Sequence, residues 1–479
     1  MNSDTFYWHD YETFGANPAL DRPSQFAGIR TDADFNVIGE PLVIYCRPAA
    51  DILPQPQACL ITGITPQLTL EKGLTEREFI ARIHDEMAQP NTCSVGYNSI
   101  RFDDEVTRYT LFRNFYDPYE REWKNGNSRW DLIDVVRMCR ALRPDGINWP
   151  DHDDGTPSFK LEHLTVANGI SHDAAHDALS DVYATIALAK LIKEKQPKLF
   201  AYMLGLRRKQ EVAMLLDLKK QTPLLHSSAM FPAARFCTSL IMPLAPHPSN
   251  KNSVICYDLS VDPTPLLQMG AEAVKARLYT PTADLPEGES RIALKTVQIN
   301  RCPVLATSKL LNDEIAARIQ LDLPAARAHY QQLKSASDLS GKLAEVFASD
   351  HAEQPKRDPE LSLYQGGFFS AADKAQMAAV RRSSPESLAE PQFQFDDERL
   401  AVLLFRYRAR NFPESLSPEE QLQWQEFCYQ RLTEEEYCEG LTLEAYLEEV
   451  EGLLAAESLS DAHRDILEAL LHYGDELLA

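Results

Sequence analysis

The hydrophobic pattern changes twice along the chain, and these changes restrict it to a protein of several domains with different folds. Over residues 1–196, short apolar runs alternate with longer stretches at helical spacing, which is typical of an α/β domain. Residues 197–350 contain short strand-like runs between proline- and glycine-containing turns, and residues 355–479 are predominantly helical in pattern. A chain of 479 residues has room for three such domains.

Apolar periodicity and turn residues predict the individual elements. In the first segment we expect strands over 5–11, 25–31, 43–47 and 92–97, and helices over 76–87, 103–115 and 176–200. In the middle segment we expect a small barrel-like set of strands over 253–260, 276–280, 292–300 and 303–306, followed by helices over 313–335 and 338–349. Pro197 should lie near the end of the long helix, because proline lacks the amide donor that a helix interior requires.

The composition excludes several classes of protein. Apolar residues make up 44% of the chain, which excludes a disordered or fibrous protein. The nine cysteines include no Cys-x-x-Cys pair, so we expect reduced thiols and a cytoplasmic location. The N-terminus does not have the pattern of a signal peptide, and no uncharged run of about 18 residues predicts a membrane helix. We therefore expect no membrane partner.

The formal net charge of −23 argues at first against a nucleic-acid partner, because phosphate binding usually leaves a basic surface. The charge is unevenly distributed, however. Residues 411–479 hold 18 acidic and 2 basic side chains, whereas residues 197–350 carry 18 basic and 14 acidic ones. We interpret the acidic C-terminal stretch as a solvated outer face, so that a nucleic-acid interface elsewhere remains open.

Asp10 and Glu12 end the first expected strand, where the two-residue period places both carboxylates on one face. They are either solvated edge residues or ligands of a divalent cation, since Mg²⁺ and Mn²⁺ prefer oxygen ligands and offset carboxylate repulsion.

Asp103 precedes an expected helix, and His176 and Asp181 lie five residues apart at the start of another. Taken singly, Asp103 suits an N-cap, and the other two suit an exposed helix surface. Together with Asp10 and Glu12 they supply four carboxylates and an imidazole with an ordinary pKa near 6.5. Two-metal phosphodiester hydrolysis needs this set, with the imidazole taking the proton of the attacking water.

Residues 108–130 interleave arginine and lysine with aromatic residues. Aromatic rings can stack on bases while cations follow the phosphates, which is how proteins bind single-stranded nucleic acid. The side chains that we expect to contact DNA are Arg108, Tyr119 and Trp123. The aromatic side chains that we expect to face a core instead are Phe112, Phe115 and Trp130.

Other basic clusters are less specific. Arg207–Lys209, Lys219 and Lys220 either line a groove or belong to an ordinary surface. A basic stripe pairs either with acidic residues of the C-terminal segment or with phosphate. Its members are Arg406, Arg408 and Arg410.

The order Asp-x-Glu, Asp, His-x4-Asp resembles the DnaQ-like, DEDDh class of 3′-to-5′ exonucleases. The segments HDYETFG, RPSQFAGIRTD, GYNSIRFDDEVTRY, NSRWDLIDVVR and AHDALSDVYATIALAKL further resemble the bacterial exodeoxyribonuclease I family. Weaker likeness continues through CPVLA, LYQGGFFS and LLFRYRARNFP, so the resemblance covers essentially the whole chain. All five catalytic positions agree with the family pattern.

The resemblance implies an α/β RNase H-like exonuclease domain over 1–196, an SH3-like domain with flanking helices over 197–350, and a helical domain over 355–479. It implies removal of 5′-mononucleotides from the 3′ end of single-stranded DNA in repair and recombination. Asp10, Glu12 and Asp181 would hold one of two Mg²⁺ ions, or Mn²⁺ in its place. Asp103 would serve the second ion, and His176 would be the base.

The resemblance also implies contacts and partners. Glu12, Arg137 and Lys160 would contact the substrate, with the two cations near the phosphates at the 3′ end. From the residues alone, Lys160 is equally a solvated charge at the start of a helix. The expected protein partner is the acidic C-terminal tail of single-stranded DNA-binding protein, and the enzyme is expected to be a monomer.

Three alternatives remain open from the residues alone. An RNA-trimming enzyme would use the same catalytic set, because that set does not select the sugar. A non-catalytic DNA-repair scaffold would retain the fold without cleavage. A glycosidase could use Asp10 and Glu12, but it would leave Asp103, His176 and Asp181 without a role.

Overall fold

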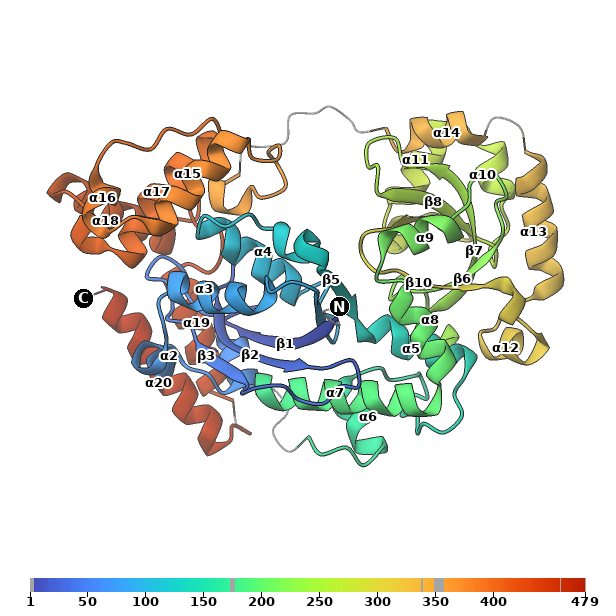
Figure 1. The fold of residues 1–479 in the computed structure, drawn as a ribbon, viewed down its shortest axis with the longest axis horizontal. Coiled ribbons are helices and arrows are strands. Elements are labelled where there is room, and N and C mark those ends of the chain that lie inside the picture. The colour runs from blue at the N-terminus through green and yellow to red at the C-terminus, as the bar shows by residue number, and fades with distance from the viewer. Residues whose placement is uncertain (1–3, 173–176, 337–338, 349–356, 457, 479) are drawn as a thin grey trace. The chain divides into compact units, whose positions relative to one another are not determined.

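The computed structural model describes residues 4–172, 177–336, 339–348, 357–456 and 458–478 (Figure 1). The chain divides into two compact units. The first comprises Met1–Ser128, Asp173–Tyr183 and Pro355–Ala479, and the second comprises Arg129–His172 and Ala184–Gln354. No helix in the described part of the chain is both long enough and apolar enough to cross a membrane.

A five-stranded mixed sheet with the order β3-β2-β1-β4-β5 organises the first segment. Its strands are β1 (Thr5–Thr13), β2 (Pro23–Thr31), β3 (Leu42–Tyr45), β4 (Thr92–Gly96) and β5 (Ser128–Asp131). The central strand β1 pairs antiparallel with β2 and parallel with β4. β1 therefore has a strand on each side. Phe6, Tyr7 and Trp8 are consecutive and point to alternate faces of the sheet, and all three are buried, so both faces are covered at this strand.

The first segment also contains seven α-helices in the described residues. They are α1 (Pro56–Thr62), α2 (Pro66–Lys72), α3 (Glu76–Met87), α4 (Asp103–Arg113), α5 (Leu132–Leu142), α6 (Leu161–Ala167) and α7 (Ala178–Lys195). Residues of α3 and α4, such as Phe79, Ile83 and Val106, form a core with Tyr7 and Phe26 of the sheet. α3 has the predicted bounds, because a capping box and a local apolar period define both of its ends.

The predicted helix over 176–200 is instead two helices. α7 ends at Lys195, and α8 (Pro197–Gly205) begins with Pro197 at its first position. Gln196 between them has non-helical backbone angles of φ −131° and ψ 54°. Proline is favoured at the first position of a helix, where its missing N–H leaves no bond unmade, so Pro197 starts a helix as well as ending one.

A second five-stranded sheet, with the order β10-β6-β7-β8-β9, organises the middle segment. Its strands are β6 (Leu224–Ser227), β7 (Thr238–Pro246), β8 (Ser253–Asp258), β9 (Leu294–Gln298) and β10 (Val304–Thr307), all paired antiparallel. The accompanying helices are α9 (Lys209–Leu215), α10 (Thr264–Gln268), α11 (Ala271–Tyr279), α12 (Asp313–Arg318), α13 (Leu323–Ser335) and α14 (Leu339–Val346).

Two predictions in this segment were wrong. Residues 276–280, expected as a strand, lie almost entirely in α11, where Val274 and Leu278 are buried one helical turn apart. The helix expected over 313–335 is interrupted between α12 and α13. Gln320 there adopts a left-handed φ of 53°, and Asp322 caps the new helix through the N–H of Ala325.

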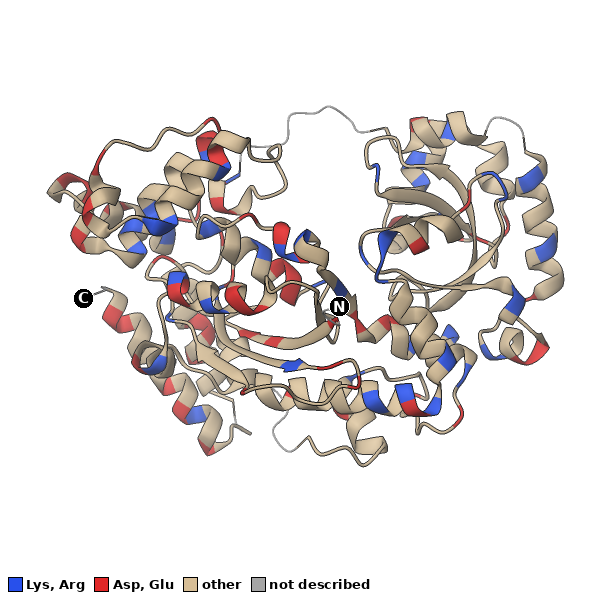
Figure 2. Cartoon of the chain, in the orientation of Figure 1, with Lys and Arg blue, Asp and Glu red and all other residues tan. Residues whose placement is uncertain are grey.

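The C-terminal segment is helical, as predicted. It contains α15 (Ala371–Arg382), α16 (Pro385–Ala389), α17 (Glu398–Asn411), α18 (Pro418–Thr433), α19 (Leu443–Leu454) and α20 (Asp461–Leu478). Within the first unit, Tyr446, Val450 and Leu467 of α19 and α20 share a core with Cys59 and Ile64 at α1. Acidic residues recur along α20 in Figure 2, which agrees with the expected solvated acidic face.

Candidate functional site

Asp10 and Glu12 lie on β1 beyond the part of the strand that pairs with β4. The parallel pairing with β4 extends only to Trp8, opposite Val95, whereas pairing with β2 continues past Asp10 and Glu12. Because side chains alternate along a strand, both carboxylates leave the same face. β4 ends at Gly96, before it reaches Asp10, so the loop that follows β4 can lie beside Asp10 and Glu12.

This loop brings Asp103 against β1. A Cβ atom on Gly96 would lie 2.6 Å from the side chain of Ser99, so the tight turn requires glycine. α4 then begins at Asp103, whose carboxylate accepts a hydrogen bond from the backbone N–H of Tyr11 at 3.0 Å. The alternative role of Asp103 as an N-cap is wrong, because Phe102 holds the N-cap position.

Asp181 enters from the first turn of α7, which is tied to the sheet by two residues that sequence reasoning missed. The side chain of Gln25 donates to the carboxylate of Asp177 at 3.2 Å and accepts from the N–H of Ala178 at 3.3 Å. The carbonyl of Asp177 in turn accepts the N–H of Asp181 at 3.1 Å. Gln25 pairs with Glu12 across β1 and β2. Two features of the sequence could have indicated these residues. Gln25 lies in the segment RPSQFAGIRTD, which resembles the family, and Asp177 directly follows the predicted base His176.

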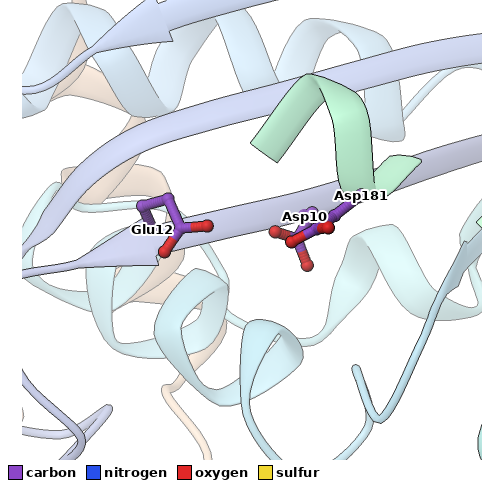
Figure 3. Close-up of side chains that lie close together, drawn as sticks. All are labelled: Asp10, Glu12 and Asp181. Atoms are coloured by element: carbon purple, nitrogen blue, oxygen red, sulfur yellow. The ribbon is translucent and has the colours of Figure 1, made fainter. Parts of the chain in front are cut away.

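Asp10, Glu12 and Asp181 form one cluster, in which one carboxylate oxygen from each lies within 4.8 Å of the others (Figure 3). Glu12 is buried and the other two are half-buried. Burial, and then the charges of Asp103, Glu12 and Asp181, raise the pKa of Asp10 well above its usual range. Burial, and then Asp181, Asp103 and Asp177, raise the pKa of Glu12 to about 8.

These shifts have two physical causes, which are removal of the carboxylates from water and repulsion between their negative charges. An oxygen-rich cluster of this charge fits a hard divalent cation, whose binding would relieve the repulsion. The donor set therefore fits the metal that the sequence predicts. His176, the predicted base, lies outside the described residues.

Arg108, which was predicted to contact DNA, is surrounded by protein side chains. It is buried, and its guanidinium donates to Glu122 at 2.7 and 2.9 Å and to Glu105 at 2.8 Å. It also donates to the hydroxyl of Tyr364 at 3.0 Å and lies over the ring of Tyr119. The structure thus makes Arg108 a support for aromatic side chains, and its contact with DNA stays a prediction.

The aromatic residues of 108–130 divide as expected between core and surface. Phe112, Phe115 and Trp130 are buried, which confirms that they face a core. Trp123 is 63% exposed, and Tyr119 is half-buried. Tyr119 contacts Tyr364 and Phe368 with ring centroids 6.5 and 5.9 Å apart, and Phe368 is 91% exposed. We call Tyr119, Trp123, Tyr364 and Phe368 the aromatic surface.

The two other cations predicted to contact DNA belong to the second unit. Arg137 is buried, donates to Asp134 at 2.6 Å and lies over the ring of Phe159. Lys160 stands at the N-cap position of α6, has a 61% exposed side chain and lies 3.4 Å from a carboxylate oxygen of Glu162. Lys160 is therefore accessible to solvent, whereas Arg137 is held by its neighbours.

The basic stripe of α17 pairs with carboxylates, as one of its two interpretations expected. Arg406 donates to Asp358 at 2.7 Å, and Arg408 donates to Glu420 at 2.7 Å. Arg410 binds Asp51 and Glu360. In the middle segment, Lys209 contacts Asn252, and Lys220 lies 3.5 Å from Asp217. These contacts are typical of structural and surface charges.

Metal-dependent phosphodiester hydrolysis requires carboxylates that can hold divalent cations, and here such a cluster lies near the end of the central strand of a mixed α/β sheet. Three family models match the chain: Exonuclease over residues 7–189, Exonuclease I SH3-like domain over 207–349, and Exonuclease I C-terminal domain over 357–477. The chain belongs to the exonuclease I family. This confirms the predicted combination of an RNase H-like exonuclease domain, an SH3-like domain and a helical C-terminal domain.

Individual relatives span the whole chain. Exodeoxyribonuclease I of Escherichia coli is 48% identical over 474 residues, which cover 99% of this chain and 98% of the relative. The structure of a moderately thermophilic exonuclease I from Methylocaldum szegediense matches with a TM-score of 0.95 and 51% identity, covering 99% of this chain and 100% of that one. The zinc-bound complex of E. coli exonuclease I with single-stranded DNA matches with a TM-score of 0.94 and 48% identity, covering 100% of each chain.

Proposed function

We propose that this chain removes 5′-mononucleotides from the 3′ end of single-stranded DNA in a reaction that depends on a divalent cation. The observation that carries the proposal is the cluster of Asp10, Glu12 and Asp181 at the end of β1. Family membership supports hydrolysis, and the complex of the E. coli relative supports single-stranded DNA as the substrate.

In this proposal, Asp10, Glu12 and Asp181 hold the principal cation, and Asp103 serves a second cation or its waters. We propose Mg²⁺, with Mn²⁺ able to replace it, since both are hard cations that prefer oxygen ligands. Bound cations supply polarisation of the attacking water and positive charge beside the leaving oxygen. Asp103 keeps its carboxylate beside β1 through the N–H of Tyr11.

His176 is proposed as the general base, with a ring nitrogen that takes the proton of the attacking water. It precedes Asp177, the residue through which Gln25 ties the start of α7 to β2. The bridge that positions Asp181 therefore also restrains the chain immediately after His176. Glu12 is proposed to contact the terminal nucleotide in addition to the cation.

The aromatic surface is the proposed platform for DNA bases. Aromatic stacking contributes about 1 to 3 kcal/mol per base and accepts any base, which suits an enzyme that degrades DNA without regard to sequence. Trp123, Tyr364 and Phe368 each expose half or more of their side chains, and groups of exposed apolar side chains often mark a binding surface. Lys160 and Arg137 are proposed to contact phosphates near the 3′ end, and Arg108 to hold Tyr119 and Tyr364 in place.

We further propose that the enzyme acts as a monomer in the cytoplasm, in DNA repair and recombination. Its proposed protein partner is the acidic C-terminal tail of single-stranded DNA-binding protein. The excess of basic over acidic side chains in residues 197–350 supports an acidic partner there. Binding of the tail peptide should weaken clearly when its terminal carboxylate is amidated, and unchanged affinity in a titration would contradict this partner.

The test of the proposed function is digestion of a 5′-labelled single-stranded DNA oligonucleotide and of its RNA counterpart, with Mg²⁺ and with EDTA. We expect Mg²⁺-dependent shortening of the DNA from its 3′ end while the RNA stays mostly intact. Asp181→Asn should abolish cleavage and still bind DNA, because it removes a metal ligand. Glu194→Gln, at an exposed position of the same helix, is the matched control and should cleave normally.

Each other outcome has a definite meaning. Trimming of RNA in place of DNA would refute the substrate and leave the carboxylate site intact. Normal cleavage by Asp181→Asn would refute the site. Absence of cleavage of either polymer by the unmodified chain would favour the non-catalytic scaffold.

A further inference from the structure

A small cavity in the first unit is lined by three arginines that have no carboxylate partner. It has a volume of about 250 Å³ and lies between α3, the end of α4, α15 and α17. The side chains that define it are Arg77, Glu78, Arg82, Tyr116, Arg381 and Tyr407. We call it the arginine pocket, and none of these residues belongs to the carboxylate cluster.

Other buried arginines of this unit are paired with acids, as Arg108, Arg113 and Arg410 show. In the arginine pocket, Arg77 lies over the ring of Phe412, with its guanidinium carbon 5.2 Å from the ring centroid. Arg381 lies over the ring of Tyr116, with its guanidinium carbon 4.2 Å from the ring centroid, and donates to the carbonyl of Phe115. Among the described residues, no carboxylate lies within ion-pair distance of either guanidinium or of Arg82.

Glu78 is the one acid among the described residues that line the pocket, and its carboxylate is used elsewhere. It accepts hydrogen bonds from the N–H of Thr75 at 3.3 Å and from the Thr75 hydroxyl at 3.1 Å, completing the capping box of α3. Arg82 is four residues further along the same helix and exposed, and it does not form the ion pair that this spacing permits.

The pocket also contains a buried hydroxyl. Tyr407 is 2% exposed, and its hydroxyl makes no hydrogen bond within the usual geometric limits among the described residues. Burial raises the pKa of this phenol to about 12, whereas the charge of Arg77 and a hydrogen bond from its guanidinium act to lower it, so Arg77 lies beside the hydroxyl. A phenol that accepts from Arg77 still has its own O–H to donate, and a ligand oxygen can accept that bond.

We propose that the arginine pocket binds the dianion of a phosphate monoester or of inorganic phosphate. Three guanidiniums and one carboxylate leave a formal charge of +2, which matches a group that carries about −1.5 to −2 at neutral pH. Guanidiniums bind phosphate oxygens through paired hydrogen bonds, and the Tyr407 hydroxyl can donate another. The ligand is either free phosphate or a 5′-mononucleotide, the product of the proposed function, and the site itself does not depend on that function.

Calorimetric titration of the full chain with inorganic phosphate tests the proposal. EDTA is present throughout, so that no divalent cation can recruit phosphate to the carboxylate cluster. We expect saturable binding with a dissociation constant below about 1 mM. Arg82→Glu should weaken it at least about tenfold, because it reverses a charge at the pocket. Arg382→Glu, at an exposed position outside the pocket, is the matched control and should change affinity less than about twofold.

Tyr407→Phe provides a second variant that keeps the ring and removes only the hydroxyl, and it should weaken phosphate binding a few-fold. Thymidine 5′-monophosphate, thymidine and acetate complete the titrations. Tighter binding of the monophosphate than of phosphate identifies the mononucleotide as the source, and the reverse identifies free phosphate. Acetate binding as tight as phosphate, no saturable phosphate binding, or equal losses in Arg82→Glu and Arg382→Glu would each overturn the proposal.

Discussion

Replacing Asp51 by asparagine should destabilise the first unit, because Asp51 anchors a buried network of charges. Asp51 is completely buried and accepts hydrogen bonds from Arg410 at 2.9 and 2.7 Å. Arg431 lies 3.6 Å away, and Glu360 binds both Arg410 and Arg22. The network joins residues separated by more than 300 positions, so it connects the start of the chain to the C-terminal helices.

The size of the effect follows from the charges and from the pKa of Asp51. Four guanidiniums face three carboxylates in the network, whose members are Arg22, Arg406, Arg410, Arg431, Asp51, Asp358 and Glu360. Burial opposes ionisation of Asp51, but Arg410 and then Arg431 outweigh it and lower its pKa from 3.8 to about 2. Nearly two pKa units correspond to roughly 2 to 3 kcal/mol. Removal of one partner of a buried pair costs about 3 to 5 kcal/mol. We therefore expect a loss of about 2 to 4 kcal/mol at neutral pH.

The pH dependence has a definite sign. A carboxyl whose pKa is lower in the folded state than in the unfolded state stabilises the fold above its unfolded pKa. That contribution is lost as the pH falls from about 4 to about 2. The difference in unfolding free energy between the natural chain and Asp51→Asn should therefore be constant from pH 5 to 8 and shrink below pH 4.

Urea unfolding combined with hydrogen–deuterium exchange measures this effect. Faster exchange is expected in α17, which carries Arg410, while β8 in the second unit keeps its protection. The control is Glu435→Gln, which removes an exposed acid and should change stability by less than about 0.5 kcal/mol. If Asp51→Asn unfolded at the same urea concentration as the control, with unchanged exchange in α17, the network would not stabilise the fold.

Three further predictions concern the site. Trp123→Ala should weaken binding of single-stranded DNA by about 5- to 150-fold in an anisotropy titration, the equivalent of about 1 to 3 kcal/mol for one stacked base, whereas Tyr429→Ala at another exposed aromatic should not. His176→Ala should slow single-turnover cleavage by about 10² to 10⁴-fold, and full activity at neutral pH would remove it from the mechanism. Because the pKa of Glu12 is about 8, binding of Mg²⁺ at pH 7 should release about one proton from Glu12. Calorimetry in buffers of different ionisation enthalpy measures this release. The affinity of the chain for Mg²⁺ should also rise with pH up to about 8.

Features that depend on neighbours along the chain were predictable. The bounds of α3 follow from the capping box that Thr75 and Glu78 form and from a regular apolar period. Ser417 caps α18 in the same way. The prediction failed at residues 276–280, where a five-residue run that ends in Tyr279 and Thr280 lies within the longer helical period of α11. Periodicity needs more than five residues to distinguish the two structures.

The candidate site was predictable as a set of residues but not as a geometry. Asp10, Glu12, Asp103 and Asp181 were recognisable from their chemistry and order. The bridge from Gln25 to Asp177 was not, because glutamine on a strand has no distinctive chemistry and its partner lies 152 residues away.

The amino-acid sequence by itself determined the three types of segment, the set of carboxylates and the resemblance to a nuclease family, because apolar periodicity and residue chemistry are local properties. Only the tertiary structure decided which charges meet. Arg108 is bound by Glu122 and Tyr364, whereas Arg77, Arg82 and Arg381 converge on a pocket without an acid that pairs with them. Ion pairs and hydrogen bonds act over a few ångströms through space, and separation along the chain does not specify those distances.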